Sequence, residues 1–275
     1  MGAMVDCGEW QVHYDVVGEG DSLILLHGGA PAASGADSYG KNIDELARHF
    51  RVHVIDFPGW GRSSSRLVPE GLLANPMEVG AEVIARFMRA VGISKAHILG
   101  GSFGGAVALH LVLKHPELVD RLVLAAPAGG ETNGPPSSGL VRLLTYYSGE
   151  GPTAEKFSEL MRHMVHDAQL LSDEMLRGRF HLSCAPERIE NFPLRLPTGG
   201  VQVPIAPLSG HPGLSDVKAP VLFLWGRNDA VQPIDALASF HRLPVQRAVI
   251  FDDCGHWPQW EYPEQFNEEV VKFLS

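Results

Sequence analysis

Short runs of apolar residues alternate along this chain with longer stretches of helical periodicity. The runs are rich in Val, Ile and Leu and end in Gly, Pro, Asp or His, which is typical of buried strands. They predict strands over residues 22–29, 51–59, 96–101, 121–129, 220–229 and 247–256. The intervening stretches predict helices over residues 78–91, 105–115, 235–242 and 263–274. This alternation predicts an α/β fold with βαβ units, a mostly parallel sheet and helices on both of its faces.

Two parts of the chain depart from the alternation. Residues 8–20 alternate polar and apolar positions around a turn, which predicts an antiparallel hairpin at the start of the sheet. Residues 131–215 begin and end in turn-rich sequence, with amphipathic helical periodicity between. We therefore expect a core of residues 1–130 and 216–275, with a helical cap at 131–215 over the carboxyl ends of the strands.

Composition and charge narrow the functional classes. The chain has 275 residues, 45% of them hydrophobic and 20% charged, and can bury a large core without disulfides. Its net charge of -10 disfavours binding to nucleic-acid phosphates. The three cysteines are widely spaced and form no zinc motif, which favours a reduced, cytoplasmic protein without a metal. We expect neither a secretory signal nor a membrane-spanning segment.

A glycine-rich stretch carries the first candidate for chemistry. Gly100-Gly101-Ser102-Phe103-Gly104 matches the G-x-S-x-G pattern and lies between a predicted strand and a predicted helix. In that context the serine occupies a sharp, strained turn whose small neighbours keep two backbones from clashing. The start of the helix directs N–H groups toward the reaction centre. A serine that only caps the helix is the alternative interpretation.

A serine nucleophile needs a base, and the order of residues supplies one. His256 follows the last apolar run and precedes the last helix, while Asp229 lies on the loop after the preceding strand. The order Ser102, Asp229, His256 is that of the α/β-hydrolase catalytic triad. Asp252 and Asp253 are nearer to His256 in sequence, but their place beside the last strand favours turn residues.

The turn after the first central strand supplies a candidate oxyanion hole. Gly29, in a His-Gly-Gly sequence, can direct its N–H at a substrate oxygen together with the N–H of Phe103. Gly28 is a further candidate for contact with the substrate. We interpret His27 as a residue that shapes this loop, and Asp56 as part of a structural turn.

With these motifs in place, the sequence resembles the α/β-hydrolase fold over its whole length. Within that fold it resembles the meta-cleavage product hydrolases, which hydrolyse C–C bonds in bacterial aromatic degradation. Four stretches carry the closer likeness, at residues 25–63, 170–180, 223–233 and 254–274. The resemblance implies that Arg179 holds the carboxylate or 2-oxo end of the substrate and that Trp257 lines the pocket. Without the resemblance, Arg179 would be read as part of a solvated helix face.

The resemblance also implies a reaction. Substrates of this family are vinylogous 1,5-diketone acids, so the expected partner is a small carboxylate. The 2-hydroxydiene is ketonised first, the serine or an activated water attacks the distal ketone, and the C–C bond breaks with a dienolate as leaving group. Neither a metal nor an organic cofactor is implied. The resemblance does imply a homodimer or a larger assembly.

Two positions depart from the family. Gly101 precedes the serine where the family has asparagine, and Ser38 stands where a second asparagine is usual. Both asparagines give the substrate polar contacts, of which Ser38 can replace one and Gly101 none. The sequence thus predicts a serine hydrolase and favours C–C cleavage. A carboxylesterase, lactonase or aminopeptidase with the same triad, or a non-catalytic receptor on this scaffold, are the alternatives.

Overall fold

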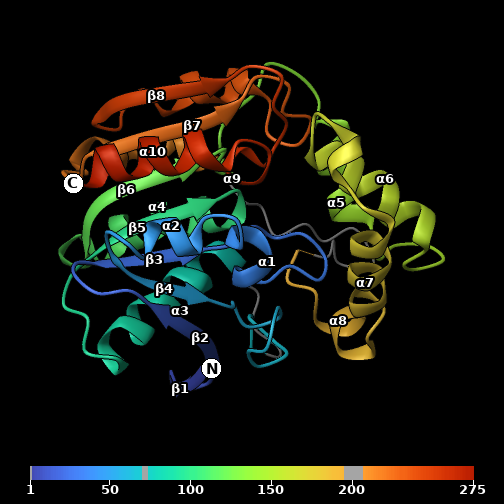
Figure 1. Ribbon diagram of the computed structural model, residues 1–275, viewed down its shortest axis with the longest axis horizontal. Helices are drawn as coiled ribbons and strands as arrows, with labels where there is room; N and C mark the ends of the chain where they lie inside the picture. The colour runs from blue at the N-terminus through green and yellow to red at the C-terminus, as the bar shows by residue number, and fades with distance from the viewer. Residues whose placement is uncertain (1, 70–73, 195–206) are drawn as a thin grey trace.

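A single twisted sheet positions the elements of this protein. The computed structural model describes residues 2–69, 74–194 and 207–275. The strands lie in the order β1-β2-β4-β3-β5-β6-β7-β8, and those from β4 to β8 are parallel. Their bounds are β1 Ala3–Asp6, β2 Gln11–Val17, β3 Ser22–Leu26, β4 Arg51–Ile55, β5 Ala96–Gly101, β6 Val119–Ala125, β7 Val221–Gly226 and β8 Val245–Phe251. The predicted α/β fold with a mostly parallel sheet is confirmed (Figure 1).

Successive side chains of a strand point to opposite faces of the sheet, and in the central strands both sets of side chains are apolar. Both faces of the sheet are therefore apolar. In β3, Leu23 and Leu25 belong to one buried cluster, while Ile24 and Leu26 belong to another. The first cluster packs against α2 and α10, and the second packs against α3 and α4. The helices of the core are α1 Gly35–Tyr39, α2 Ile43–Leu46, α3 Pro76–Ala90, α4 Phe103–Lys114, α9 Pro258–Glu261, α10 Pro263–Leu274 and the short 3-10 helix η1 Pro116–Leu118.

The amino-terminal hairpin is built from different residues than predicted. Its strands are β1 and β2, which pair antiparallel, so the turn lies at residues 7–10 and the stretch 8–20 supplies only the second of the two strands. On its other side β2 pairs antiparallel with β4 and so joins the hairpin to the parallel sheet. The alternation across residues 11–17 therefore belongs to the single strand β2, which pairs with β1 on one side and with β4 on the other.

Two elements near the carboxyl end also differ from prediction. Residues 235–242 were expected as an α-helix, but the structure has the 3-10 helix η5 Ile234–Phe240, which Pro233 precedes. Hydrogen bonds there run three residues back, as from the N–H of Ala236 to the carbonyl of Pro233. The strand β8 was expected to be buried, yet its first four residues are exposed because it forms the edge of the sheet.

The segment between β6 and β7 contains helices that lie beside the core. Figure 1 shows α5 to α8 gathered to one side of the sheet. These helices are α5 Ser138–Thr145, α6 Ala154–Met164, α7 Asp173–Ser183 and α8 Pro186–Asn191. The segment also contains the 3-10 helices η2 Ala168–Leu170, η3 Leu208–Gly210 and η4 Pro212–Asp216, and Gly213 of η4 lies against Leu113 of α4. The N–H of His256 donates to the carbonyl of Met164 at 2.9 Å, so α6 ends against a loop at the carboxyl edge of the sheet. The cap boundaries of 131–215 stay a prediction.

Four of the buried histidines have a pKa that burial lowers. The pKa falls to about 4 for His53 and His110, and desolvation also lowers the pKa of His27 and His97. Neither ring nitrogen of His53 has a hydrogen-bond partner among the described residues. Below about pH 6.5 the unfolded chain binds protons at these positions that the folded chain does not bind, so acid destabilises the fold.

We therefore expect the free energy of unfolding, from urea titrations, to decrease as the pH falls from about 6.5 to about 4.5. Each such histidine adds up to about 1.4 kcal/mol per pH unit to this slope. Glu261 opposes it in part, because burial raises the pKa of that carboxyl. His53→Phe should flatten the slope, and the exposed control His241→Phe should not. Equal slopes in the parent and both variants would refute this origin of acid sensitivity.

Candidate active site

The backbone of Ser102 lies in a strained conformation between β5 and α4. Its φ of 51° and ψ of -115° are rare for a residue with a side chain. Its N–H donates to the carbonyl of Ala125 at 2.9 Å, and its carbonyl accepts from Ala106 and Ala128 at 3.1 and 3.0 Å. Its hydroxyl makes no capping bond to α4 among the residues that the structure describes. The interpretation of Ser102 as a helix cap is therefore wrong.

Glycines around Ser102 allow β5 and α4 to approach this closely. A Cβ atom on Gly100 would lie 2.4 Å from the carbonyl oxygen of Gly104, and one on Gly104 would lie 2.2 Å from that of Leu26. Neither distance is tolerated by a real side chain, and both obstacles are backbone. The pattern G-x-S-x-G is thus a packing requirement at this turn, as the sequence predicts.

Asp229 and His256 meet at the carboxyl edge of the sheet. The Nδ1 of His256 lies 2.7 Å from Oδ2 of Asp229, and both side chains are buried. The other oxygen of Asp229 accepts the N–H groups of Val231 and Gln232, each at 2.8 Å. The carboxylate is therefore held from two sides, and its bond to Nδ1 leaves Nε2 of the imidazole as the nitrogen available for proton transfer.

The other acidic candidates have structural partners. Asp252 pairs with Arg227 on the surface. Asp56 accepts the N–H of Gly35 at 2.8 Å and of Arg62 at 2.9 Å, and lies 3.0 Å from His13. Asp56 thus ties the loops after β3 and β4 together, which agrees with its interpretation as part of a structural turn.

His27 is fixed by hydrogen bonds at both ring nitrogens. Its Nε2 accepts the N–H of Phe57 at 3.0 Å, so Nδ1 carries the proton and donates to the carbonyl of Gly28 at 2.7 Å. Burial also lowers its pKa, so the ring stays neutral. A histidine held in this way shapes the loop and has no free nitrogen to act as a base.

The His27 turn lies against the Ser102 turn. A Cβ on Gly28 would be 3.5 Å from Cβ of Ser102, and one on Gly29 would be 3.2 Å from Cβ of Phe103. Phe103 is the first residue of α4, whose first N–H groups have no acceptor within the helix. The structure thus brings Gly29 and Phe103 together beside Ser102, as a pair of oxyanion donors requires.

Arg179 of α7 faces a small pocket beside Trp257. The centre of its guanidinium lies 5.4 Å from the centroid of the Trp257 ring. Its Nε is buried and has no hydrogen-bond partner in the described ranges. Burial lowers the pKa of the guanidinium, and the charge of Asp37 opposes this. Arg177, two residues earlier, is exposed and pairs with Asp173, so the solvated-face interpretation holds for Arg177 and is wrong for Arg179.

The same pocket contains Ser38 and three residues that the sequence did not indicate. It is lined by Asp37, Ser38, Arg179, Trp257, Gln259 and Trp260. Gln259 is 6% exposed, and its Oε1 is unpartnered among the described residues. Its position two residues after Trp257 was the only available signal, and a lone glutamine carries no specific chemistry.

Tyr39 accounts for the space next to Gly101. Its hydroxyl donates to the carbonyl of Leu26 at 3.0 Å, and a Cβ on Gly101 would lie 3.3 Å from that hydroxyl oxygen. A longer side chain at position 101 would have to displace the buried Tyr39 or turn away from it. The family asparagine is therefore replaced here by a glycine packed beside a tyrosine.

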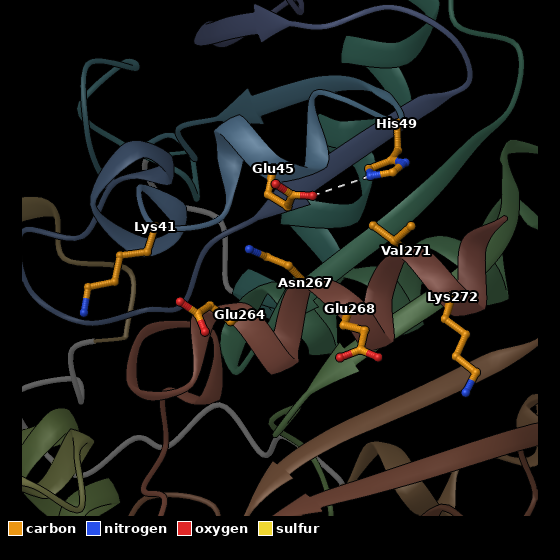
Figure 2. Close-up of a pocket in the computed structure, with 8 residues that line it drawn as sticks. All are labelled: Lys41, Glu45, His49, Glu264, Asn267, Glu268, Val271 and Lys272. Carbon is orange, nitrogen blue, oxygen red and sulfur yellow. Dashed lines mark ion pairs between the residues drawn. The ribbon is translucent and has the colours of Figure 1, made fainter.

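A second hollow lies between α2 and α10, and Figure 2 shows its lining. Its residues are Lys41, Glu45, His49, Glu264, Asn267, Glu268, Val271 and Lys272. Lysines and glutamates of both signs surround it, and Glu45 pairs with His49 at 3.6 Å. It contains no nucleophile with an adjacent base, so we assign the candidate active site to Ser102.

Two other kinds of site are absent from the residues that the structure describes. No helix there has the length and apolarity needed to cross a bilayer. No group of three or more His, Cys, Asp or Glu side chains in the same residues could hold a metal ion.

Comparisons with known proteins agree with the fold. The family described as alpha/beta hydrolase fold matches residues 21–263. A 2-hydroxy-6-oxononadienedioate/2-hydroxy-6-oxononatrienedioate hydrolase from Burkholderia vietnamiensis is 36% identical, over 98% of this chain and 92% of the relative. A 2-hydroxy-6-oxo-6-phenylhexa-2,4-dienoate hydrolase from Burkholderia cepacia is 34% identical, over 97% and 92%. A meta-cleavage product hydrolase from Pseudomonas fluorescens IP01 has a TM-score of 0.88 at 30% identity, covering 100% of this chain and 97% of that chain.

The packing at the Ser102 turn predicts the effect of a single methyl group. Gly104→Ala forces a Cβ into the carbonyl of Leu26 and should lower the free energy of unfolding by about 1–3 kcal/mol. Gly178→Ala is the matched control, because no atom lies within 4 Å of its added Cβ and its helical position favours alanine by roughly 0.5–1 kcal/mol. Urea unfolding of both variants measures the difference, and equal stabilities would contradict the packing described.

Proposed function

This chain belongs to the α/β-hydrolase family and, within it, to the meta-cleavage product hydrolases, and on that premise we propose that it hydrolyses a C–C bond in a vinylogous 1,5-diketone acid. The observation that carries the choice of substrate is Arg179, a partly desolvated cation in the pocket beside Trp257. Its unpartnered Nε would be satisfied by a carboxylate or a 2-oxo oxygen. A desolvated Nε that has no hydrogen-bond partner among the described residues carries a free-energy cost, which an acidic substrate would offset.

In the proposed reaction Ser102, Asp229 and His256 act together. Asp229 holds the imidazole through Nδ1, and Nε2 removes the proton from the Ser102 hydroxyl or from a water. The oxygen that loses the proton attacks the distal ketone of the ketonised substrate. The N–H groups of Gly29 and Phe103 would stabilise the resulting oxyanion.

The intermediate then collapses with cleavage of the C–C bond. The bonding electrons leave with the dienolate, which takes a proton and becomes a dienoic acid. If Ser102 has been acylated, water releases the acyl group as a carboxylic acid and restores the hydroxyl. Water is thus the co-substrate that balances the reaction, since it supplies OH to one product and H to the other.

Four residues are proposed to bind the acidic half of the substrate. Arg179 would pair with the carboxylate or 2-oxo group, Trp257 would form the apolar wall, and Ser38 and Gly28 would give polar contacts. Ester hydrolysis is the second candidate activity, because Gly101 and Ser38 stand where the family has amide side chains. A carboxylesterase or lactonase needs the triad and the oxyanion donors, and does not need those amides.

We further propose that the enzyme works in the reducing cytoplasm as a homodimer or larger assembly. Cys7 and Cys254 are free and buried, and burial raises the pKa of the Cys7 thiol to about 11. Buried thiols of raised pKa are inert toward oxidation, and free thiols are typical of a reduced compartment. The oligomeric state rests on the family resemblance.

The proposal predicts loss of a coloured substrate. With 2-hydroxy-6-oxo-6-phenylhexa-2,4-dienoate, the substrate named for the relative from Burkholderia cepacia, the yellow dienolate absorbance should decay on addition of enzyme. Ser102→Ala should keep its fold and lose about 1,000-fold or more in kcat. If the colour persists while p-nitrophenyl acetate is hydrolysed rapidly, esterase activity is the better assignment. Full activity in Ser102→Ala would refute the role of this serine.

A second prediction separates an acid-binding pocket from a general effect of the cap. Arg179→Ala should lower kcat/KM for the dienolic acid by roughly 10- to 100-fold, the value of a hydrogen bond to a charged group. It should spare hydrolysis of the neutral p-nitrophenyl acetate. Arg177→Ala, on the exposed face of the same helix, is the control and should change neither rate. Equal losses with both substrates would argue against a carboxylate clamp.

A further inference from the structure

The carboxylate of Glu261 joins the His256 loop to the end of α6. Its Oε1 accepts the N–H of Gly255 at 2.7 Å. Its Oε2 accepts the N–H of His166 at 2.7 Å and that of Asp167 at 3.4 Å. Gly255 directly precedes His256, and His166 lies just beyond the last turn of α6. One side chain at the end of α9 therefore contacts both segments through backbone groups.

The His256 loop and the end of α6 lie so close together that position 255 has no room for a side chain. A Cβ on Gly255 would lie 2.7 Å from both the nitrogen of His166 and the carbonyl carbon of Val165. Next to this contact the N–H of His256 donates to the carbonyl of Met164 at 2.9 Å. The His256 loop is therefore supported by backbone of α6 on one side and by Glu261 on the other.

Several donors around Glu261 favour an ionised carboxylate. Besides the three N–H groups, the thiol of Cys254 lies 3.6 Å from Oε1. Burial raises the pKa of Glu261, and these hydrogen bonds oppose that shift. Glu261 is half-buried at the end of α9, and these hydrogen bonds offset the cost of removing its carboxylate from water.

We infer that Glu261 is a positioning residue for the proposed hydrolase, which holds the backbone at Gly255 and His256 so that the imidazole faces Ser102. Asp229 sets the rotation of the imidazole ring, whereas Glu261 sets the place of the loop that carries it. Because the same carboxylate binds the residues that follow α6, it also couples the position of this helix to that of His256. The inference rests on the proposed role of His256 as the base.

Glu261→Gln is the sharpest substitution, because it keeps the size of the side chain. One amide group cannot accept from backbone N–H donors on both sides, since its NH₂ is itself a donor. The variant should keep its cooperative unfolding and lose the contact to one segment. Glu264→Gln is the control, a removed charge at an exposed position of the adjacent helix.

Kinetics and hydrogen exchange together test the inference. With p-nitrophenyl acetate as the probe, Glu261→Gln should lower kcat by about 10- to 100-fold and leave KM within about threefold, as expected for a displaced base. The amides of Gly255, His166 and Asp167 should exchange at least about tenfold faster than in the parent, while amides of α4 stay protected. Glu264→Gln should change none of these values.

Three outcomes would overturn the role of Glu261. Unchanged kcat despite faster exchange would show that the contact does not position the base, and unchanged exchange would show that the contact does not hold the loop. A rise in KM alone would assign the residue to substrate binding and would likewise overturn the inference. Hydrogen exchange is measured without a substrate, and hydrolysis of p-nitrophenyl acetate does not depend on the ability of the enzyme to cleave a C–C bond. Failure here is therefore distinguishable from failure of the proposed reaction, which persistence of the coloured dienolate would show.

Discussion

The backbone of Ser102 is held where most residues with a side chain do not go, and the site is arranged around that constraint. A φ of 51° costs of order 1–3 kcal/mol, and hydrogen bonds to β6 and α4 together with the glycines at 100 and 104 maintain it. Both flanking elements are central and buried, so they cannot relax. The direction of the Ser102 side chain is therefore set by the sheet itself, and loops need only bring the other groups to it.

Those groups arrive from separate parts of the chain at one edge of the sheet. Gly29 comes from the turn after β3, Asp229 from the loop after β7, and His256 from the loop after β8. The segment between β6 and β7 adds Arg179, which lies beside Trp257. Under the proposed function, the core would supply the hydrolytic groups, and the added helices would supply the cation that binds an acid. Glu261 lies between the His256 loop of the core and the end of α6, and contacts both.

Sequence patterns could predict most of the core because it follows local rules. Apolar runs located the central strands, and the spacing around Ser102 indicated a turn that tolerates no side chain at Gly104. They could not predict the edge position of β8, since exposure depends on which strands are neighbours. The contacts of Glu261 and Gln259 were also invisible, because they join segments that are distant in sequence and involve backbone groups. Arg179 was recognised only through family resemblance, since its helix also carries an exposed arginine.

The most direct test of C–C hydrolysis at this site identifies the bond that breaks. The enzyme is mixed with 2-hydroxy-6-oxo-6-phenylhexa-2,4-dienoate in water enriched in oxygen-18, and the products are identified by mass spectrometry. Attack on the distal ketone predicts equal amounts of benzoate and 2-hydroxypenta-2,4-dienoate, with the heavy oxygen in the benzoate carboxylate. Recovery of the unreacted substrate from an enzyme preparation that hydrolyses p-nitrophenyl acetate would contradict C–C hydrolysis at this site.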